Sequence, residues 1–173
     1  YGKEPYEYGR ADRLDDILKD GYIRFFLMHA LTYRTQMLRD MGYRQTEGIS
    51  YTDTQWACYP VFRAKDITFL NINVYQYNLA REGQTMDPKV IAKSLGQMQK
   101  MTLQLIDFFS NYDKASLSET RLTFIKQYYA NRIRLLYKNY LLDIPYDSFK
   151  ADELVELDAK LTEANNRFGF GQI

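Results

Sequence analysis

The sequence has very few of the side chains that build metal and redox sites. Its 173 residues include one cysteine and one histidine. A single cysteine, Cys58, excludes a disulfide within the chain and a cysteine-rich zinc site, so we expect a small buried hydrophobe. A single histidine, His29, excludes a histidine cluster, so we expect a structural role for it. These shortages remove most enzyme classes before any motif is considered.

The sequence also lacks an excess of charge and a long hydrophobic run. It has 23 Lys and Arg against 22 Asp and Glu, a formal net charge of +1. No basic surplus is therefore present for binding nucleic-acid phosphates. The densest apolar stretch, residues 22–33, is far shorter than the roughly 20 residues of a membrane-spanning helix. We expect no nucleic acid among its partners and no transmembrane segment. The chain starts at Tyr1 without a methionine, so we expect either that a presequence was removed or that the chain was trimmed.

Apolar and aromatic residues are abundant, at 46% and 16% of the chain, and are enough for one core. Their spacing predicts a single all-α, elongated domain over residues 1–173. A strand remains an alternative for residues 67–74, because several of them are β-branched. The expected parts are an irregular arm (1–9), a long N-terminal helix (10–41, stopped by Gly42), a connector (43–60), a second helix (61–82), a long antiparallel helical hairpin (87–142) and a short acidic C-terminal helix with a tail (147–168).

The hairpin gives the clearest signal. Asp87 and Pro88 supply a helix cap and a proline at the first helical position. Ser116 and Glu119 have the spacing of a capping box for a second helix. Each helix then repeats apolar residues in steps of three and four, which keeps one stripe facing a partner helix. The seam positions are Ile91, Leu95, Met98, Thr102, Leu105, Phe109 and Tyr112 in the first helix, and Leu122, Ile125, Tyr129, Ile133, Leu136 and Tyr140 in the second.

No group of residues forms a catalytic or cofactor site. The glycines at positions 169 and 171 lack the following helix and lysine of a phosphate loop. The carboxylates Asp152, Glu153 and Glu156 lack the alternating oxygen ligands of a calcium loop, so a solvated helix face is expected. We therefore expect no cofactor, no bound metal and no enzymatic activity.

The aromatic residues exceed what a two-helix seam can bury. Amphipathic rings left over after such a hairpin closes are typical of surfaces that another protein covers. The alternative is that these rings close a compact core of four or five helices. The residues predicted to contact a partner are Phe25, Phe26, Phe108, Tyr128 and Tyr137.

Three short stretches resemble the subunit d family of mitochondrial F-type ATP synthases. Residues 144–154 (IPYDSFKADEL) are similar to a Pro-aromatic-Asp segment that follows a long helix in that family and leads into an acidic helix. Residues 56–59 (WACY) resemble its Trp-Ala-x-Tyr connector, and residues 166–169 (NRFG) resemble the ending of some members. Lys150 departs from the family, which has a helix-capping threonine there. The residues that carry the resemblance are Trp56, Tyr59, Pro145, Tyr146, Asp147, Asp152, Glu153 and Leu154.

The resemblance implies a non-catalytic subunit of the peripheral stalk, the stator that resists rotor torque during proton-driven ATP synthesis. Such a subunit lies on the matrix side of the mitochondrial inner membrane and packs along subunit b and neighbouring stalk subunits. Two other functions remain open. One is an accessory subunit of another respiratory complex, and the other is a bacterial extracytoplasmic helical bundle that senses or binds a ligand.

Overall fold

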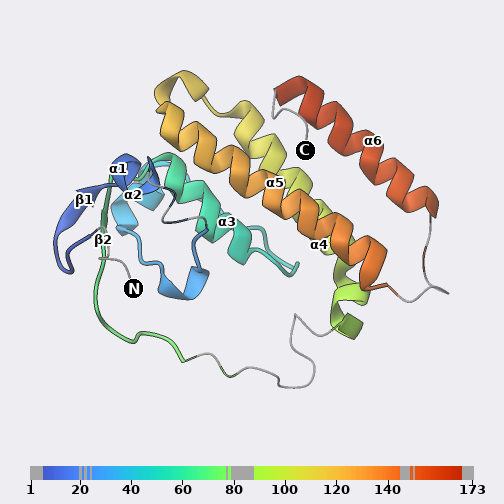
Figure 1. Ribbon diagram of the computed structural model, residues 1–173, viewed down its shortest axis with the longest axis horizontal. Helices are drawn as coiled ribbons and strands as arrows, with labels where there is room; N and C mark the ends of the chain where they lie inside the picture. The colour runs from blue at the N-terminus through green and yellow to red at the C-terminus, as the bar shows by residue number, and fades with distance from the viewer. Residues whose placement is uncertain are drawn as a thin grey trace. The chain divides into compact units, whose positions relative to one another are not determined.

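The computed structural model describes residues 6–19, 21, 23, 25–76, 78, 88–144, 149 and 151–168. This part of the chain is mostly helical, as predicted, with one small sheet (Figure 1). The helices are α1 (Leu14–Lys19), α2 (Thr35–Asp40), α3 (Asp53–Cys58), α4 (Pro88–Asn111), α5 (Glu119–Leu142) and α6 (Ala151–Phe168). The strands are β1 (Ala11–Arg13) and β2 (Asp66–Thr68), and the 3₁₀ turns are η1 (Met28–Ala30), η2 (Tyr59–Phe62) and η3 (Lys114–Ser116).

The fold divides into two compact units. Unit 1 comprises residues 1–47, 52–77 and 113–128. Unit 2 comprises residues 48–51, 78–112 and 129–173. No helix in the described part of the chain is long and apolar enough to cross a membrane.

The predicted long helix over residues 10–41 is wrong. Residues 11–13 form β1 instead, and α1 ends after six residues. Gly21 follows with a φ of +65°, a left-handed conformation that glycine adopts without a steric penalty and that a helix cannot continue through. Gly42 does stop a helix, as predicted, but that helix is the short α2. The N–H of Gly42 donates to Arg39 O, and the N–H of Tyr43 donates to Leu38 O. These two hydrogen bonds form a Schellman motif.

The prediction of a second helix over residues 61–82 is also wrong for those of its residues that the structure describes. The chain makes the turn η2 and then β2, so β-branched Ile67 and Thr68 follow their strand preference. The strand alternative for residues 67–74 holds only for Ile67 and Thr68, and the described residues from 69 to 76 have no regular secondary structure. The connector, in turn, is not irregular throughout, because it contains α3.

Unit 1 is built around the antiparallel pair β1–β2, with Asp12 opposite Ile67. The α1 helix, α3, η2 and the first ten residues of α5 supply its apolar interior. Cys58 is 1% exposed, so its prediction as a small buried hydrophobe is confirmed. The buried apolar residues of this unit are Leu14, Ile17, Leu18, Ala57, Cys58, Tyr59, Val61, Phe62, Phe124, Ile125 and Tyr128.

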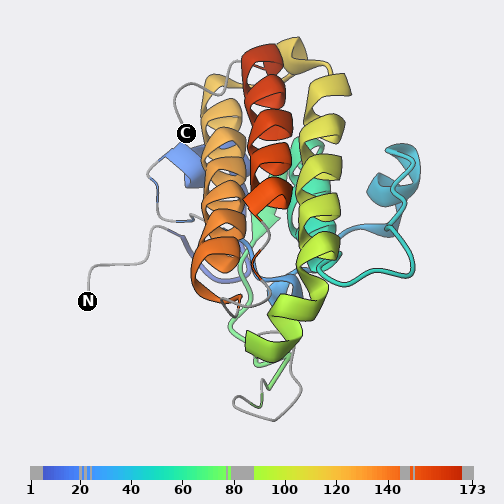
Figure 2. The same ribbon diagram turned by 90° about the vertical axis from the view of Figure 1, so that its right-hand side faces the viewer.

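Unit 2 packs α4, the end of α5 and α6 against one another (Figure 2). Hydrogen bonds join α4 to the end of α5: Tyr129 Oη donates to Leu105 O, Asn139 Nδ2 to Met98 Sδ at 3.0 Å, and Tyr140 Oη to Gln99 Oε1 at 3.1 Å. Partners later in α5 lie earlier in α4, so these segments run antiparallel. The predicted seam is buried at Ile91, Leu95, Met98, Thr102, Leu105, Phe109, Tyr129, Ile133, Leu136 and Tyr140.

The residue that caps the start of α5 differs from the predicted one. The predicted capping box placed Ser116 at the cap, but Ser116 lies in η3. Ser118 caps α5 instead, because its Oγ accepts the backbone N–H of Arg121 at 3.1 Å. The continuous hairpin over residues 87–142 involves both units and stays a prediction.

Candidate protein-docking surface

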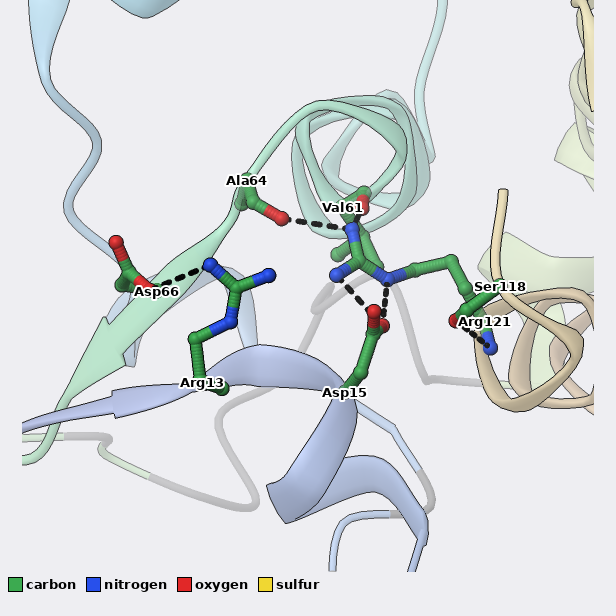
Figure 3. A network of polar contacts seen from close by, with 7 residues as sticks. All are labelled: Arg13, Asp15, Val61, Ala64, Asp66, Ser118 and Arg121. Carbon is green, nitrogen blue, oxygen red and sulfur yellow. Dashed lines mark hydrogen bonds and ion pairs between the residues drawn. The ribbon is translucent and has the colours of Figure 1, made fainter. Parts of the chain in front are cut away.

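A buried arginine organises the interior of unit 1 (Figure 3). The Arg121 side chain is 7% exposed, and its Nε and Nη2 each lie 2.7 Å from Asp15 Oδ1. Its Nη1 donates to the carbonyl oxygens of Val61 at 2.6 Å and Ala64 at 2.7 Å. One guanidinium therefore joins α1, η2 and the residues that follow η2 to the beginning of α5.

The Arg121 network is structural rather than a site for a ligand. Its donors are aimed at a carboxylate and two carbonyls of the same chain, which is how a buried charge is compensated. The nearby pair of Arg13 and Asp66, 3.6 Å apart and more than half exposed on both sides, contributes little by comparison. The role of Arg121 was not predicted from the sequence. The available signal was its spacing of three, four and seven residues from Phe124, Ile125 and Tyr128, which puts it on the apolar face of α5.

Aromatic rings pack around Trp56, one of the residues that carry the family resemblance. The ring of Tyr33 lies 5.0 Å from Trp56 and that of Tyr43 lies 5.8 Å away, both edge to face. Tyr43 also contacts Tyr59, at 6.4 Å between ring centres. The Tyr33 hydroxyl donates to the carbonyl oxygen of Trp56 at 3.1 Å. Trp56 and Tyr59 thus pack against rings of their own chain.

Burial makes two of these phenols poor acids. It raises the pKa of Tyr33 well above its ordinary value, with smaller contributions from Cys58 and Tyr43. It also raises the pKa of Tyr43 to about 12, with a smaller contribution from Tyr59. Both hydroxyls therefore keep their protons at neutral pH, which suits packing and hydrogen bonding rather than acid–base chemistry.

We expect the free energy of unfolding to fall steeply above pH 10. The unfolded chain loses tyrosine protons near pH 10, its ordinary pKa, whereas folded Tyr43 holds its proton to about pH 12. Stability present below pH 10 is therefore lost as the pH rises toward 12. Urea denaturation as a function of pH measures this effect, and Tyr33→Phe is expected to make the fall shallower. Tyr8→Phe, at an exposed position, is the control; the same slope in both variants would contradict the assignment.

The five residues predicted to contact a partner are not brought together. In unit 1, Phe25 is 63% exposed, Phe26 is half-buried with its ring 5.6 Å from Phe124, and Tyr128 is buried. In unit 2, Phe108 and Tyr137 are half-buried. Tyr128 is buried by its own chain, so its position needs no second protein to explain it. Phe25 is exposed, as a residue that contacts a partner protein must be.

Tyr137 fastens α6 to α5 rather than lying free on the surface. Its hydroxyl donates to Asp158 Oδ1 at 2.5 Å. Partial burial raises the pKa of Tyr137 above its ordinary value, and the hydrogen bond to Asp158 and the charge of that carboxylate add to the shift. Phe108, near the end of α4, has its ring 6.0 Å from that of Tyr112, which directly follows the helix.

The acidic part of the family motif lies at the beginning of α6. Asp152 and Glu153 are exposed in its first turn, where carboxylates favour the positive end of the helix dipole. Leu154 is half-buried, and Pro145, Tyr146 and Asp147 lie outside the described residues. Glu156 forms an ion pair with Lys160 at 2.5 Å, which lowers the pKa of its carboxyl. Within the described ranges, no three His, Cys, Asp or Glu residues are placed to hold a metal ion.

Large exposed apolar side chains are the remaining candidates for a functional surface. In unit 1, Phe25 and Leu27 flank half-buried Phe26 and are 63% and 59% exposed. A second exposed segment of unit 1 covers residues 70–76. It includes Tyr75, which is stacked on His29 with ring centres 4.3 Å apart. Such surfaces can bind another protein without any chemistry. Comparisons of the chain with protein-family models, with curated proteins and with solved structures found no match.

Proposed function

We propose that this chain is a non-catalytic structural subunit of a larger protein assembly. The observation that carries the proposal is the exposure of Phe25 and Leu27, at 63% and 59%. Single apolar residues are common on protein surfaces, but two large ones within three residues form a small patch. A partner that covered the patch would gain about 25 cal/mol for each Å² of apolar surface removed from water. We name residues 25–27 the N-terminal apolar patch.

The specific assembly that we propose is the peripheral stalk of the mitochondrial F-type ATP synthase. The resemblance of residues 56–59 and 144–154 to the subunit d family supports this choice. The two longest helices also suit a stator, since α4 and α5 have 24 residues each. Helices of that length extend about 36 Å. In this proposal the predicted hairpin lies along subunit b on the matrix side of the inner membrane and resists rotor torque.

Isolation of the assembly from the native source tests the proposal. A tagged full-length chain is expected to purify with subunit b and the catalytic head of the ATP synthase. The double variant Phe25→Ser with Leu27→Ser is expected to lose at least tenfold in recovered partner, because it removes the N-terminal apolar patch. Thr32→Ser, at an exposed polar position, is the matched control and is expected to recover the partner normally.

Other outcomes separate this proposal from its alternatives. Purification with a different respiratory complex would keep the structural role and overturn the ATP synthase assignment. A compact monomer that binds a small molecule and purifies with no other chain would overturn both. Circular dichroism of the double variant shows whether a loss of partner arises from unfolding, which is not expected at exposed positions.

A further inference from the structure

Residues 69–75 have a sequence that reads almost the same in both directions. The segment is FLNINVY, and Ile72 is its centre. On either side stand two asparagines, then Leu70 and Val74, then the aromatic residues Phe69 and Tyr75. No residue of the segment is charged or is a proline or glycine. We name residues 69–75 the palindromic segment.

The structure leaves the middle of the palindromic segment exposed. Leu70, Ile72 and Val74 are 61%, 61% and 65% exposed. Alternate positions of an extended chain share one face, so these three aliphatic side chains make an apolar stripe. Their two asparagine neighbours are exposed as well. The segment follows β2 directly, and Figure 1 shows it leading away from that strand without a helical turn.

Both ends of the segment are held by rings of the same unit. Phe69 stacks on Tyr6, with ring centres 3.6 Å apart, and its carbonyl oxygen accepts the N–H of Gly9 at 2.8 Å. Tyr75 stacks on His29. Between these anchors, residues 70–74 make no backbone hydrogen bond to any other described residue. The exposed middle therefore offers an apolar stripe and a backbone edge that no described residue pairs with.

We propose that the palindromic segment pairs with the same segment of a second copy of this chain, as antiparallel strands related by a two-fold axis through Ile72. In that register Leu70 faces Val74 of the other copy, the two asparagines face one another, and Ile72 faces Ile72. A two-fold interface requires a surface that complements itself, which is the property of a palindromic sequence. Because no charge lies in the segment, no like charges meet across the pair.

The size of the contact predicts a weak dimer. Leu70, Ile72, Val74 and Tyr75 of each copy, at roughly 100 Å² removed per side chain, would together bury about 800 Å² before the backbone is counted. This is near the lower limit for a specific interface, so we expect a dissociation constant on the order of 10 µM. The inference does not depend on the proposed function, since it concerns a second copy and uses a different surface.

Charge substitution at the two-fold position tests the pairing on the full-length chain. Sedimentation equilibrium is expected to show a reversible monomer–dimer equilibrium for the natural sequence. Ile72→Lys and Ile72→Asp, each measured alone, are expected to weaken the dimer at least tenfold, because like charges face one another. An equimolar mixture of the two variants is expected to regain the natural affinity within about threefold. The control Thr32→Lys places the same charge at an exposed site outside the segment and is expected to dimerise normally.

Cysteine pairs test the orientation of the strands. Under mild oxidation, a mixture of Leu70→Cys and Val74→Cys chains is expected to form the mixed disulfide, whereas each chain alone forms little. The proposal would be overturned by a natural chain that stays monomeric up to 1 mM, about a hundredfold above the expected dissociation constant. A mixture of the charged variants that fails to pair, or a disulfide formed by Leu70→Cys alone, would also overturn it. So would open-ended aggregates in place of a closed dimer.

Discussion

Replacing Arg121 with methionine is expected to lower the free energy of unfolding by about 3 to 5 kcal/mol. The substitution leaves the buried carbonyl oxygen of Val61 and the part-buried one of Ala64 without this donor, and a buried unpaired acceptor costs about 1 to 3 kcal/mol. It also leaves Asp15 without its cation. Because the Asp15 side chain is 31% exposed and keeps some water, most of the loss comes from the two carbonyls. Urea denaturation measures the change.

A second arginine of the same helix provides the control for Arg121. Arg134 is exposed, and the hydrogen bond shown for it is to Asn131, one turn away. Arg134→Met is therefore expected to change the unfolding free energy by less than about 0.5 kcal/mol. Arg121→Lys is expected to recover only part of the loss, because one ammonium cannot reproduce the geometry of a guanidinium fork. Equal effects at positions 121 and 134 would show that the network does not hold unit 1 together.

Replacing Leu157 with alanine is expected to lower the free energy of unfolding by about 3 kcal/mol. Leu157 is fully buried and, with Leu161, forms the apolar face by which α6 packs in unit 2. Truncation removes buried methyl groups and leaves a cavity that the rigid neighbours fill only in part. Hydrogen exchange is expected to speed up at the amides of α6 first, since this helix loses its main apolar contact.

Val155 provides the matched comparison on α6. Its side chain is 68% exposed, so Val155→Ala is expected to stay within about 0.5 kcal/mol of the natural chain. Unchanged exchange rates throughout α6 in Leu157→Ala would mean that this helix is held mainly by other contacts, such as the hydrogen bond from Tyr137 to Asp158.

The parts of the fold that the sequence predicts well are those governed by a regular local pattern. The steps of three and four residues in α4 and α5 place Met98, Leu105 and Tyr129 in the buried seam. Residues 10–41 show similar steps, yet β1 takes three of these residues into a sheet with β2, a partner more than 50 residues away. Spacing alone carries no information about such a distant partner, and the left-handed conformation of Gly21 then ends α1.

The candidate docking surface was only partly predictable for the same reason. Phe25 could be selected because it is a ring in excess of what a helical seam can bury. Tyr128 was selected on the same grounds, but the packing of unit 1 buries it. Arg121 escaped notice because its partners, Asp15 and two backbone carbonyls, come from distant segments. The palindrome around Ile72 is visible in the sequence, but only the exposed structure distinguishes it from a buried strand.

Solvent accessibility of the N-terminal apolar patch, compared in the free and assembled states, tests the central claim most directly. Hydroxyl-radical footprinting of Phe25 and Leu27 on the isolated chain is expected to show strong oxidation of both side chains. The same chain within an assembly purified from its native source is expected to show at least a fivefold lower oxidation rate at both. Equal rates in the two states, with protection confined to other parts of the chain, would contradict the view that a neighbouring subunit covers this surface.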